Sequence, residues 1–385
     1  MNFSRDEVVT LLSDLVKIES VTPWLIESGA GERKQAEFLA DWLSDTNLEV
    51  TLDEVADGRP NLLVRLRGNG TGPTLCINAH ADTVGFANWS DRALTPKIEG
   101  DRMIGLGAAD DKAGCVSALL AVRALAKQNI ELSGDVLVAC VIDEEGISIG
   151  TEHLVANHKI DYAIVIEPTG LPIAITEHQG FGWIDIIVHG KAAHGSAPDA
   201  GIDAIVHMAE VVKRLHELDE REWAPNPDPK NGRTVFHTGT IHGGTDYATY
   251  PNRVVLGIEI GSQPGETLDN RVSEIEQIFS DIKKDLPNFH GEVDVKLNRN
   301  PFVGAGYEPL LAAMDKAAIT VIGKPMEPRG ENSWTDAALL QEAGIPTLLV
   351  GPAGGNYHAE DEWVSIPEVV QMTEILYLTI VELLK

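Results

Sequence analysis

Histidine and carboxylate residues follow several apolar segments of this 385-residue chain, each near the point where the segment ends. His80 lies just after the apolar run 74–78, and Asp82 lies two positions further on. In an open α/β sheet, ligands bind at the carboxyl ends of the strands. An imidazole in this position can therefore reach a ligand, and a nearby carboxylate can orient its ring. Taken alone, His80 is better explained as a histidine with an ordinary hydrogen-bond partner near the surface.

A loop of small residues, 105–114, supplies the next carboxylate, Asp110. The loop precedes a helical pattern, but it is not a dinucleotide fingerprint, because an acid stands in place of the third glycine and would repel a pyrophosphate. An aspartate pointing forward between glycines would instead reach a cation. Capping of the next helix by Asp110 or Asp111 is the simpler explanation of this loop alone.

Carboxylates also end two more apolar runs. Three consecutive acids, 143–145, follow the run 135–142, and Glu167 follows the run 162–166. His358 lies in a further acidic segment near the C-terminus. A charge run usually marks a solvated loop, yet crowded like charges at the edge of a core are unfavourable unless a cation, a proton or solvent relieves them. Five such segments, each with a histidine or a carboxylate, are difficult to explain as independent coincidences.

Two zinc ions would account for the whole set. Two histidines and three carboxylates would give each ion one imidazole, one terminal carboxylate and a shared carboxylate. One further carboxylate, Glu144, would then take a proton from a water held between the ions. The ligands in this hypothesis are His80, Asp110, Glu145, Glu167 and His358.

The elements that position these residues follow from hydrophobic periodicity. Nearly continuous apolar runs predict strands that are covered on both faces. Helical patterns alternate with them, which predicts an α/β sheet with helices on both sides. Ser4 and Glu7 have the spacing of a capping box at the first helix. The predicted helices cover 8–16, 32–44, 113–127, 310–322, 336–343 and 367–384, and the strands 61–66, 74–78, 135–142, 162–166 and 346–350.

The pattern changes after about residue 178. Apolar and polar residues alternate at 181–188, 235–241 and 253–260, and amphipathic helices are predicted at 201–218 and 268–282. This order predicts a small α+β domain inserted between residues 179 and 292. Residues 1–178 and 293–385 are predicted to form one α/β domain.

Composition excludes several classes of protein. Lys and Arg total 30 against 59 Asp and Glu, a net charge of −29, which makes nucleic acid and anionic membranes improbable partners. No apolar run approaches the ~20 residues that span a bilayer, and the first residues lack a signal-peptide pattern. The three cysteines are too scattered for a disulfide framework. We therefore expect a reduced, cytoplasmic protein.

Together these segments resemble the zinc-dependent amidohydrolases and exopeptidases of the M20 family, which includes acetylornithine deacetylase, succinyl-diaminopimelate desuccinylase, aminoacylase and glutamate carboxypeptidase. The resemblance spans nearly the whole chain, in family order. It rests on His80-Ala81-Asp82, Gly107-Ala108-Ala109-Asp110-Asp111-Lys112, Asp143-Glu144-Glu145, Glu167-Pro168-Thr169 and His358. It implies a zinc-exopeptidase-like mixed sheet flanked by helices, with the insert as a ferredoxin-like lid and dimerisation domain.

The resemblance also implies the roles of the metal ligands. Two Zn²⁺ per subunit would be the cofactors, with Co²⁺ or Mn²⁺ as substitutes. His80 and Glu167 would bind one ion, Glu145 and His358 the other, and Asp110 would bridge them.

Further residues have roles in the family. Asp82 would orient His80, and Glu144 would be the general base and then the proton donor. The segment Lys191 to Pro198 resembles one whose histidine, here His194, stabilises an oxyanion, commonly in the partner subunit of a homodimer. A simple turn histidine is the alternative. A cis peptide after the bridging aspartate is a family feature, which makes Asp110–Asp111 a candidate.

The sequence departs from the family in the insert. Related enzymes often hold a substrate carboxylate with an Asn and an Arg near a proline, and Ala248 and Gly261 stand at those places. Arg253 or Asn252 would have to substitute. The resemblance implies a small N-acyl amino acid or short peptide as the substrate, but the sequence does not identify the acyl group.

A second segment, 330–337, resembles the family's substrate-binding loop. Asn332, Ser333 and Gly354 are the candidates for contact with a substrate carbonyl or carboxylate. Trp334 is a candidate wall of the substrate pocket, although packing explains a half-buried tryptophan equally well.

Two alternatives remain at this point. The segment Gly146-Ile147-Ser148-Ile149-Gly150, followed by Asp336 and His358, matches the pattern of a serine hydrolase. However, four residues separate Ser148 from the preceding strand, so the sharp nucleophile elbow is missing, and the other acids stay unexplained. A non-catalytic relative that binds a metal or an amino acid is the second alternative. A base such as Glu144 beside the ligands argues against it.

Overall fold

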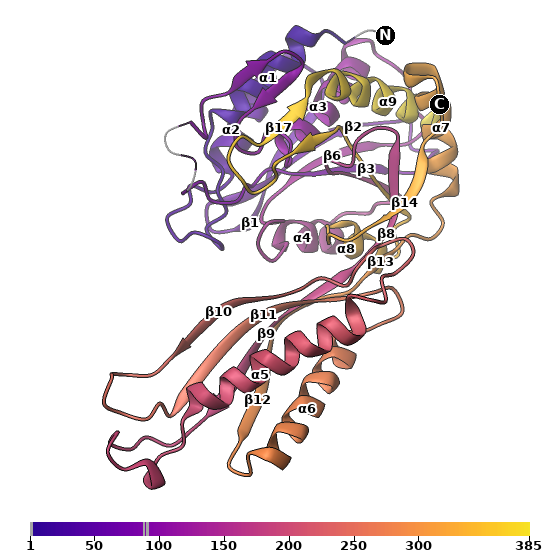
Figure 1. Cartoon of the computed structure of the whole chain (residues 1–385). Helices are drawn as coiled ribbons and strands as arrows, with labels where there is room; N and C mark the ends of the chain where they lie inside the picture. The colour runs from indigo at the N-terminus through magenta and orange to yellow at the C-terminus, as the bar shows by residue number, and fades with distance from the viewer. Residues whose placement is uncertain (1–2, 88, 90–91) are drawn as a thin grey trace. The chain divides into compact units, whose positions relative to one another are not determined.

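The computed structural model describes residues 3–87, 89 and 92–385 (Figure 1). The first two residues of the N-terminal segment lie outside this range. The described chain forms two compact units. The first contains residues up to Thr176 with 304–329 and 335–385, and the second contains 177–303 with 330–334. The second unit runs on past residue 292 because the strand His290–Arg299 pairs with Gly180–His189.

The first unit is built on a mixed sheet, as the α/β pattern predicts. Its strands lie in the order β1-β2-β6-β3-β7-β15-β8. β3 runs parallel to β6 and β7, and β15 is parallel to β7. The strands are β1 (Glu49–Ala56), β2 (Arg59–Leu66), β3 (Leu75–His80), β6 (Val136–Val141), β7 (Tyr162–Ile166), β8 (Ile173–His178) and β15 (Thr347–Val350). β14 (Glu327–Glu331) and β13 (Phe302–Val303) also pair with β8.

The central strands β3, β6 and β15 are buried along their whole length, which explains their nearly continuous apolar sequences. Figure 1 shows α3 and α9 on one side of this sheet and α4 and α8 on the other. α1 begins with the predicted capping box, in which the side chains of Ser4 and Glu7 each accept a backbone N–H. The helices are α1 (Arg5–Val16), α2 (Arg33–Trp42), α3 (Lys112–Lys127), α4 (Ile149–Asn157), α7 (Glu308–Ile322), α8 (Ala337–Glu342) and α9 (Ile366–Leu384).

A second, small sheet of the first unit was not predicted, because its strands are only two or three residues long. Its order is β16-β17-β5-β4. β17 pairs antiparallel with β5, so that Trp363 lies opposite Ile104. This pairing brings the C-terminal acidic segment beside the loop that carries Asp110. The strands are β4 (Lys97–Glu99), β5 (Arg102–Ile104), β16 (Gly354–Gly355) and β17 (Trp363–Ser365).

The second unit is an antiparallel sheet in the order β10-β11-β9-β12. Alternate residues of β9 are buried, the pattern of a sheet with one covered face. Two helices pack on that face, and their apolar residues form a core separate from that of the first unit. The elements are β9 (Gly180–His189), α5 (Ala204–Leu218), β10 (Phe236–Gly243), β11 (Arg253–Ser262), α6 (Leu268–Asp285) and β12 (His290–Arg299), with short helical turns at Pro198–Ala200 and Asp219–Trp223.

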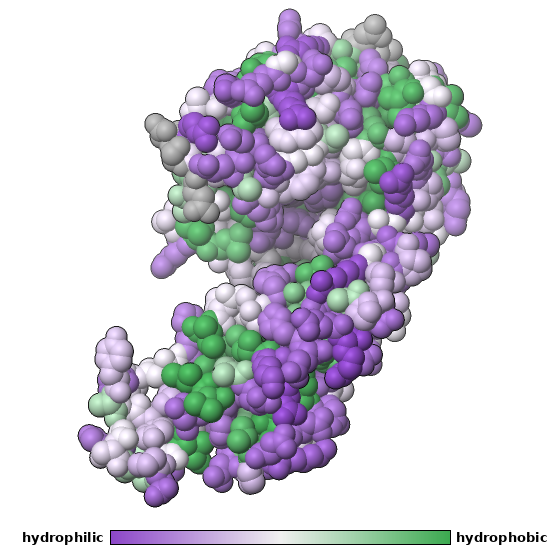
Figure 2. Space-filling view, in the orientation of Figure 1, coloured by the Kyte–Doolittle hydropathy of each residue, from purple (hydrophilic) through white to green (hydrophobic). Residues whose placement is uncertain are grey.

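Hydrophilic residues cover much of the surface in view, with hydrophobic residues in smaller patches (Figure 2). Within the described residues, no helix combines the length and the hydropathy that are needed to cross a membrane.

Candidate metal centre

His80 is the last residue of β3 and is 2% exposed. Its Nε2 atom lies 2.9 Å from Asp110 Oδ1 and 4.0 Å from Glu167 Oε1. Its Nδ1 atom lies 3.1 Å from the backbone carbonyl oxygen of Asp82. The end of β3 therefore aims one ring nitrogen at the acidic residues, while the other has a backbone partner.

Asp82 is fully buried and joins two of these strand ends. Its Oδ1 and Oδ2 accept the backbone N–H groups of Glu144 and Glu145, each at 3.1 Å. Its carboxylate is 3.6 Å from His80 Nδ1, further than the Asp82 carbonyl oxygen. The carboxylate thus fixes the segment after β6, a contact that sequence spacing alone does not show.

Asp110 lies between two histidines. Its Oδ1 faces His80, and its Oδ2 lies 3.4 Å from His358 Nε2. The Asp110–Asp111 peptide bond is cis, as the resemblance implies. Asp111 accepts the N–H of Gly114 and caps α3. The two acids therefore divide the two roles considered for them: Asp111 caps the helix, and Asp110 faces the imidazoles.

Glu362 supports the Asp110 loop, a role that the sequence pattern does not predict. Its buried carboxylate accepts the backbone N–H groups of Gly107, Ala109 and Asp110 at 2.9, 2.8 and 3.1 Å. Gly107 has φ +70°, and a side chain there would meet Thr83. The sequence shows Glu362 only as part of an acidic run. Its role follows from the pairing of β17 with β5.

Glu145 and His358 complete this side of the cluster. His358 Nε2 lies 3.1 Å from Glu145 Oε1. Hydrogen bonding to Asp110 and Glu145 raises the pKa of His358 to about 11. Burial tends to raise the pKa of Asp110, but the hydrogen bonds from His358 and His80 outweigh it and lower that pKa. Asp110 is thus the anion that both imidazoles stabilise.

Glu144 and Glu167 lie with His80, with one ligand atom from each of the three within 4.8 Å of the others. Burial raises the pKa of both carboxyl groups well above the ordinary value, and neighbouring acids raise it further. The pKa of Glu145 is raised for the same two reasons. Such a group of acids is unfavourable without positive charge nearby.

The residues fit a pair of divalent cations. Glu145 Oε1 is buried, and the imidazole of His358 faces it at 3.1 Å. The donors are imidazole nitrogens and carboxylate oxygens, the set that suits Zn²⁺ and related ions. Cations between these donors would stabilise the charged form of the buried carboxyl groups, whose pKa values are raised without them.

Two networks hold the strand ends behind the acids. Asp143 has φ +68°. Its carboxylate accepts hydrogen bonds from Thr22 Oγ1 at 2.6 Å and from Arg59 Nη2 at 2.9 Å. Thr151 Oγ1 donates to Asp336 Oδ2 at 2.6 Å and is 2.9 Å from Asn78 Nδ2. Asp143 and Asp336 therefore serve as structural acids.

The other predicted site residues lie mostly in the second unit. His194 is exposed there, with its Nδ1 atom 2.8 Å from Ser196 Oγ. Arg253 is exposed at the start of β11, and Asn332 and Ser333 are exposed in the segment 330–334. Gly354, half-buried in β16, belongs to the first unit. Of these five residues, the structure thus places only Gly354 in the same unit as the candidate metal centre.

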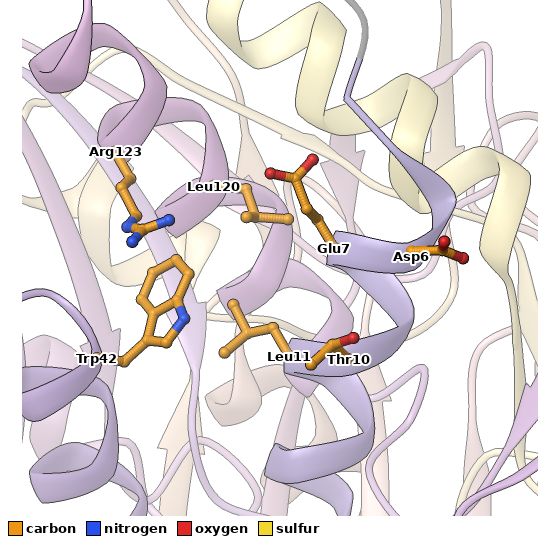
Figure 3. Close-up of a pocket in the computed structure, with 7 residues that line it drawn as sticks. All are labelled: Asp6, Glu7, Thr10, Leu11, Trp42, Leu120 and Arg123. Carbon is orange, nitrogen blue, oxygen red and sulfur yellow. The ribbon is translucent and has the colours of Figure 1, made fainter.

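A pocket of about 270 Å³ lies in another part of the first unit (Figure 3). α1, α2 and α3 supply its walls, and Arg123 lies over the ring of Trp42 at 4.5 Å. None of the candidate site residues lines it.

The fold and this cluster are typical of one class of protein, the metal-dependent hydrolases, with candidate ligands at strand ends and in the loops beside them. The model of the family described as Peptidase family M20/M25/M40 matches residues 76–382 of this chain. An acetylornithine deacetylase of Aliivibrio fischeri (strain ATCC 700601 / ES114) is 31% identical over 360 residues, 88% of this chain and 89% of the relative. The chain belongs to the M20 family and is a hydrolase of amide bonds.

Two further relatives show the range of the family. The N-formyl-4-amino-5-aminomethyl-2-methylpyrimidine deformylase of Bacillus subtilis (strain 168) is 27% identical, covering 97% of this chain and 93% of the relative. A dinuclear metal binding peptidase of the M20 family from Bacillus subtilis has the same fold, with a TM-score of 0.72, 15% identity and 98% of each chain covered.

Family membership and geometry do not support the serine hydrolase alternative. Ser148 is buried, with φ +59°, in the turn before α4. The imidazole of His358 faces Asp110 and Glu145. The G-x-S-x-G pattern is therefore a coincidence of sequence.

Proposed function

We propose that the chain hydrolyses the amide bond of an N-acyl amino acid or a short peptide at this cluster, with two Zn²⁺ ions and with Glu144 as the base. One observation carries the proposal: the two oxygens of Asp110 face different imidazoles, Oδ1 toward His80 and Oδ2 toward His358. A carboxylate between two histidines has the arrangement that a shared ligand requires.

In this proposal His80, Glu167 and Asp110 would hold one cation, and His358, Glu145 and Asp110 the other. Zn²⁺ suits the nitrogen and oxygen donors, and Co²⁺ or Mn²⁺ would substitute for it. When bound, such ions polarise a carbonyl group and lower the pKa of a nearby water.

Glu144 would hold and move the proton. Its carboxyl group lies beside His80 and Glu167 but is not needed as a ligand. Burial favours its neutral form, so Glu144 would retain a proton taken from water until the leaving amine accepts it. Asp82, which binds the N–H groups of Glu144 and Glu145, would fix the position of this base and of the adjacent ligand.

The second unit would supply substrate contacts. We assign His194 to the oxyanion and Arg253, Asn332 and Ser333 to the substrate's polar groups, with Gly354 from the first unit. Supporting this, His194, Arg253, Asn332 and Ser333 are exposed. The names of two relatives indicate acetylornithine and a formylated pyrimidine as their substrates. This favours a substrate with a small acyl group.

We further propose that the second unit is the lid and dimerisation domain of a homodimer, in a cytoplasmic enzyme. The edge strands β10 and β12 leave backbone groups free to pair with another chain. The three cysteines are buried free thiols, as in reducing compartments. Light scattering at several protein concentrations would test the dimer.

The variant Glu144→Gln tests the central role. We expect it to keep both metal ions, measured by plasma mass spectrometry, and to lose at least ~100-fold in kcat on the best substrate of an N-acyl amino acid panel. Glu131→Gln, an exposed acid in a loop, is the control and should retain wild-type kcat. Retention of kcat within ~10-fold in Glu144→Gln would exclude Glu144 as the base.

A further inference from the structure

Three potential metal ligands lie together in the second unit, and the proposed hydrolysis uses none of them. They are His189, His290 and Glu292. Each can offer one ligand atom, and the three atoms lie within 4.8 Å of one another. The sequence does not reveal this group, because a hundred residues separate His189 from the other two.

Strand pairing brings the residues together. His189 is the last residue of β9, and it lies opposite His290, the first residue of β12. Their rings stack, with centroids 4.8 Å apart and planes inclined by 28°. Glu292 lies two positions after His290 and therefore points to the same face of the sheet. Two strands thus hold all three side chains in place.

The distances match a coordination sphere better than a hydrogen bond. Glu292 Oε1 lies 3.4 Å from His189 Nε2 and 3.6 Å from His290 Nε2. Both distances exceed the ~2.7–3.2 Å of an N–H···O hydrogen bond. Tetrahedral ligands at ~2.0–2.1 Å from a zinc ion are ~3.3–3.4 Å apart. One oxygen therefore lies at about one tetrahedron edge from each of two nitrogens.

His189 is the least exposed of the three side chains, at 34% against 64% for His290 and 52% for Glu292. Its Nε2 atom is buried and has no hydrogen-bond partner among the described residues. A buried ring nitrogen without a partner is unfavourable. An ion between Nε2 and the Glu292 carboxylate would remove that cost, since imidazole nitrogen is a good ligand for divalent transition metals.

We propose that His189, His290 and Glu292 form a third metal site, which binds Zn²⁺ or a similar divalent transition-metal ion. Three protein ligands leave one tetrahedral position for water. Arg253 lies opposite His189 on β11 and places a positive group on the neighbouring strand. The negative charge of Glu292 is therefore essential to binding.

The bound ion would fasten an edge strand. β12 is the last strand of its sheet and pairs only with β9 among the described strands. The site lies at the first residues of β12, where an edge strand frays most readily. A metal bridge from His189 to His290 and Glu292 would hold this end closed.

Metal stoichiometry of the full-length protein tests the proposal. The chain is dialysed to equilibrium against a series of buffers that hold free Zn²⁺ at about 0.1–100 µM. Bound zinc is then measured by plasma mass spectrometry. We expect the wild type to bind one more equivalent than His290→Ala or Glu292→Gln. His242→Ala, an exposed histidine of the same sheet, is the matched control and should bind as the wild type does. Equal stoichiometry in all four proteins would overturn the proposal.

A second readout locates the ion. In protein labelled with ¹⁵N at histidine, zinc should shift the ring-nitrogen resonances of His189 and His290 but not that of His242. Zinc should also slow amide hydrogen exchange at the start of β12 at least tenfold in the wild type and not in His290→Ala. Unmoved resonances of His189 and His290 would refute the site. Hydrolysis should be unchanged in His290→Ala, and the one-equivalent difference holds whether or not the cluster around Asp110 binds metal, so the two proposals fail independently.

Discussion

The carboxylate of Glu362 gives the sharpest test of how the candidate metal centre is held. It accepts three backbone N–H groups from the loop that carries Asp110. The variant Glu362→Gln keeps the size and shape of the side chain. It replaces one acceptor oxygen by an amide group that donates. The change is therefore confined to hydrogen bonding and charge.

The magnitude follows from this count of hydrogen bonds. The remaining carbonyl oxygen of the glutamine can still accept from Ala109 and Asp110, but its amide would face the N–H of Gly107. One buried N–H is left unpaired, at a cost of ~1–3 kcal/mol. The neutral amide also removes the burial of a charge, which acts in the opposite direction, so the net loss in unfolding free energy should be ~1 kcal/mol. Metal affinity should fall more clearly, by ~10–100-fold, because groups behind the ligands set their orientation.

The assay compares Glu362→Gln with Glu360→Gln, which makes the same chemical change two positions earlier, on an exposed side chain. Zinc affinity is measured by competition with a chromophoric chelator, and unfolding free energy by urea titration of the metal-free proteins. The control should match the wild type in both. If Glu362→Gln bound zinc within ~3-fold of the control, the inference that Glu362 positions Asp110 would be wrong.

Three further results are expected. Removal of metal with a chelator should lower the midpoint of thermal unfolding. Zinc at ~100 times its Kd should restore ~2.7 kcal/mol of unfolding free energy. An unchanged midpoint would mean that the buried acids need no cation. Burial raises the pKa of Cys76 to about 12, so a maleimide should label Cys76 only after unfolding in urea, and rapid labelling of the native protein would contradict its burial. Burial lowers the pKa of His207 below 6.5, so as the pH falls through 6.5 the unfolded state binds a proton before the folded state does, and the free energy of unfolding decreases. His207→Gln should lose less of this free energy over the same range. A ¹H NMR titration that placed the pKa of folded His207 above 6.5 would reverse the expected pH dependence.

Much of the fold could be predicted because burial on both faces of a strand leaves a direct trace in sequence. The runs at β3, β6 and β7 are nearly continuously apolar, and each ends within two residues of an acid or a histidine. The insert was recognisable by its alternating strands. Short strands such as β16 and β17 leave no such trace, because two or three residues cannot establish a period.

The sequence by itself determined which chemical groups this protein presents: histidines and acids at the ends of buried strands, in the order of the M20 family. Tertiary structure decided how they meet. Which oxygen of Asp110 faces which imidazole, the support of its loop by Glu362 and the stacking of His189 on His290 all depend on strand register. Register is set by packing and hydrogen bonds between segments that lie far apart in the chain, and such contacts have no local signature in the sequence.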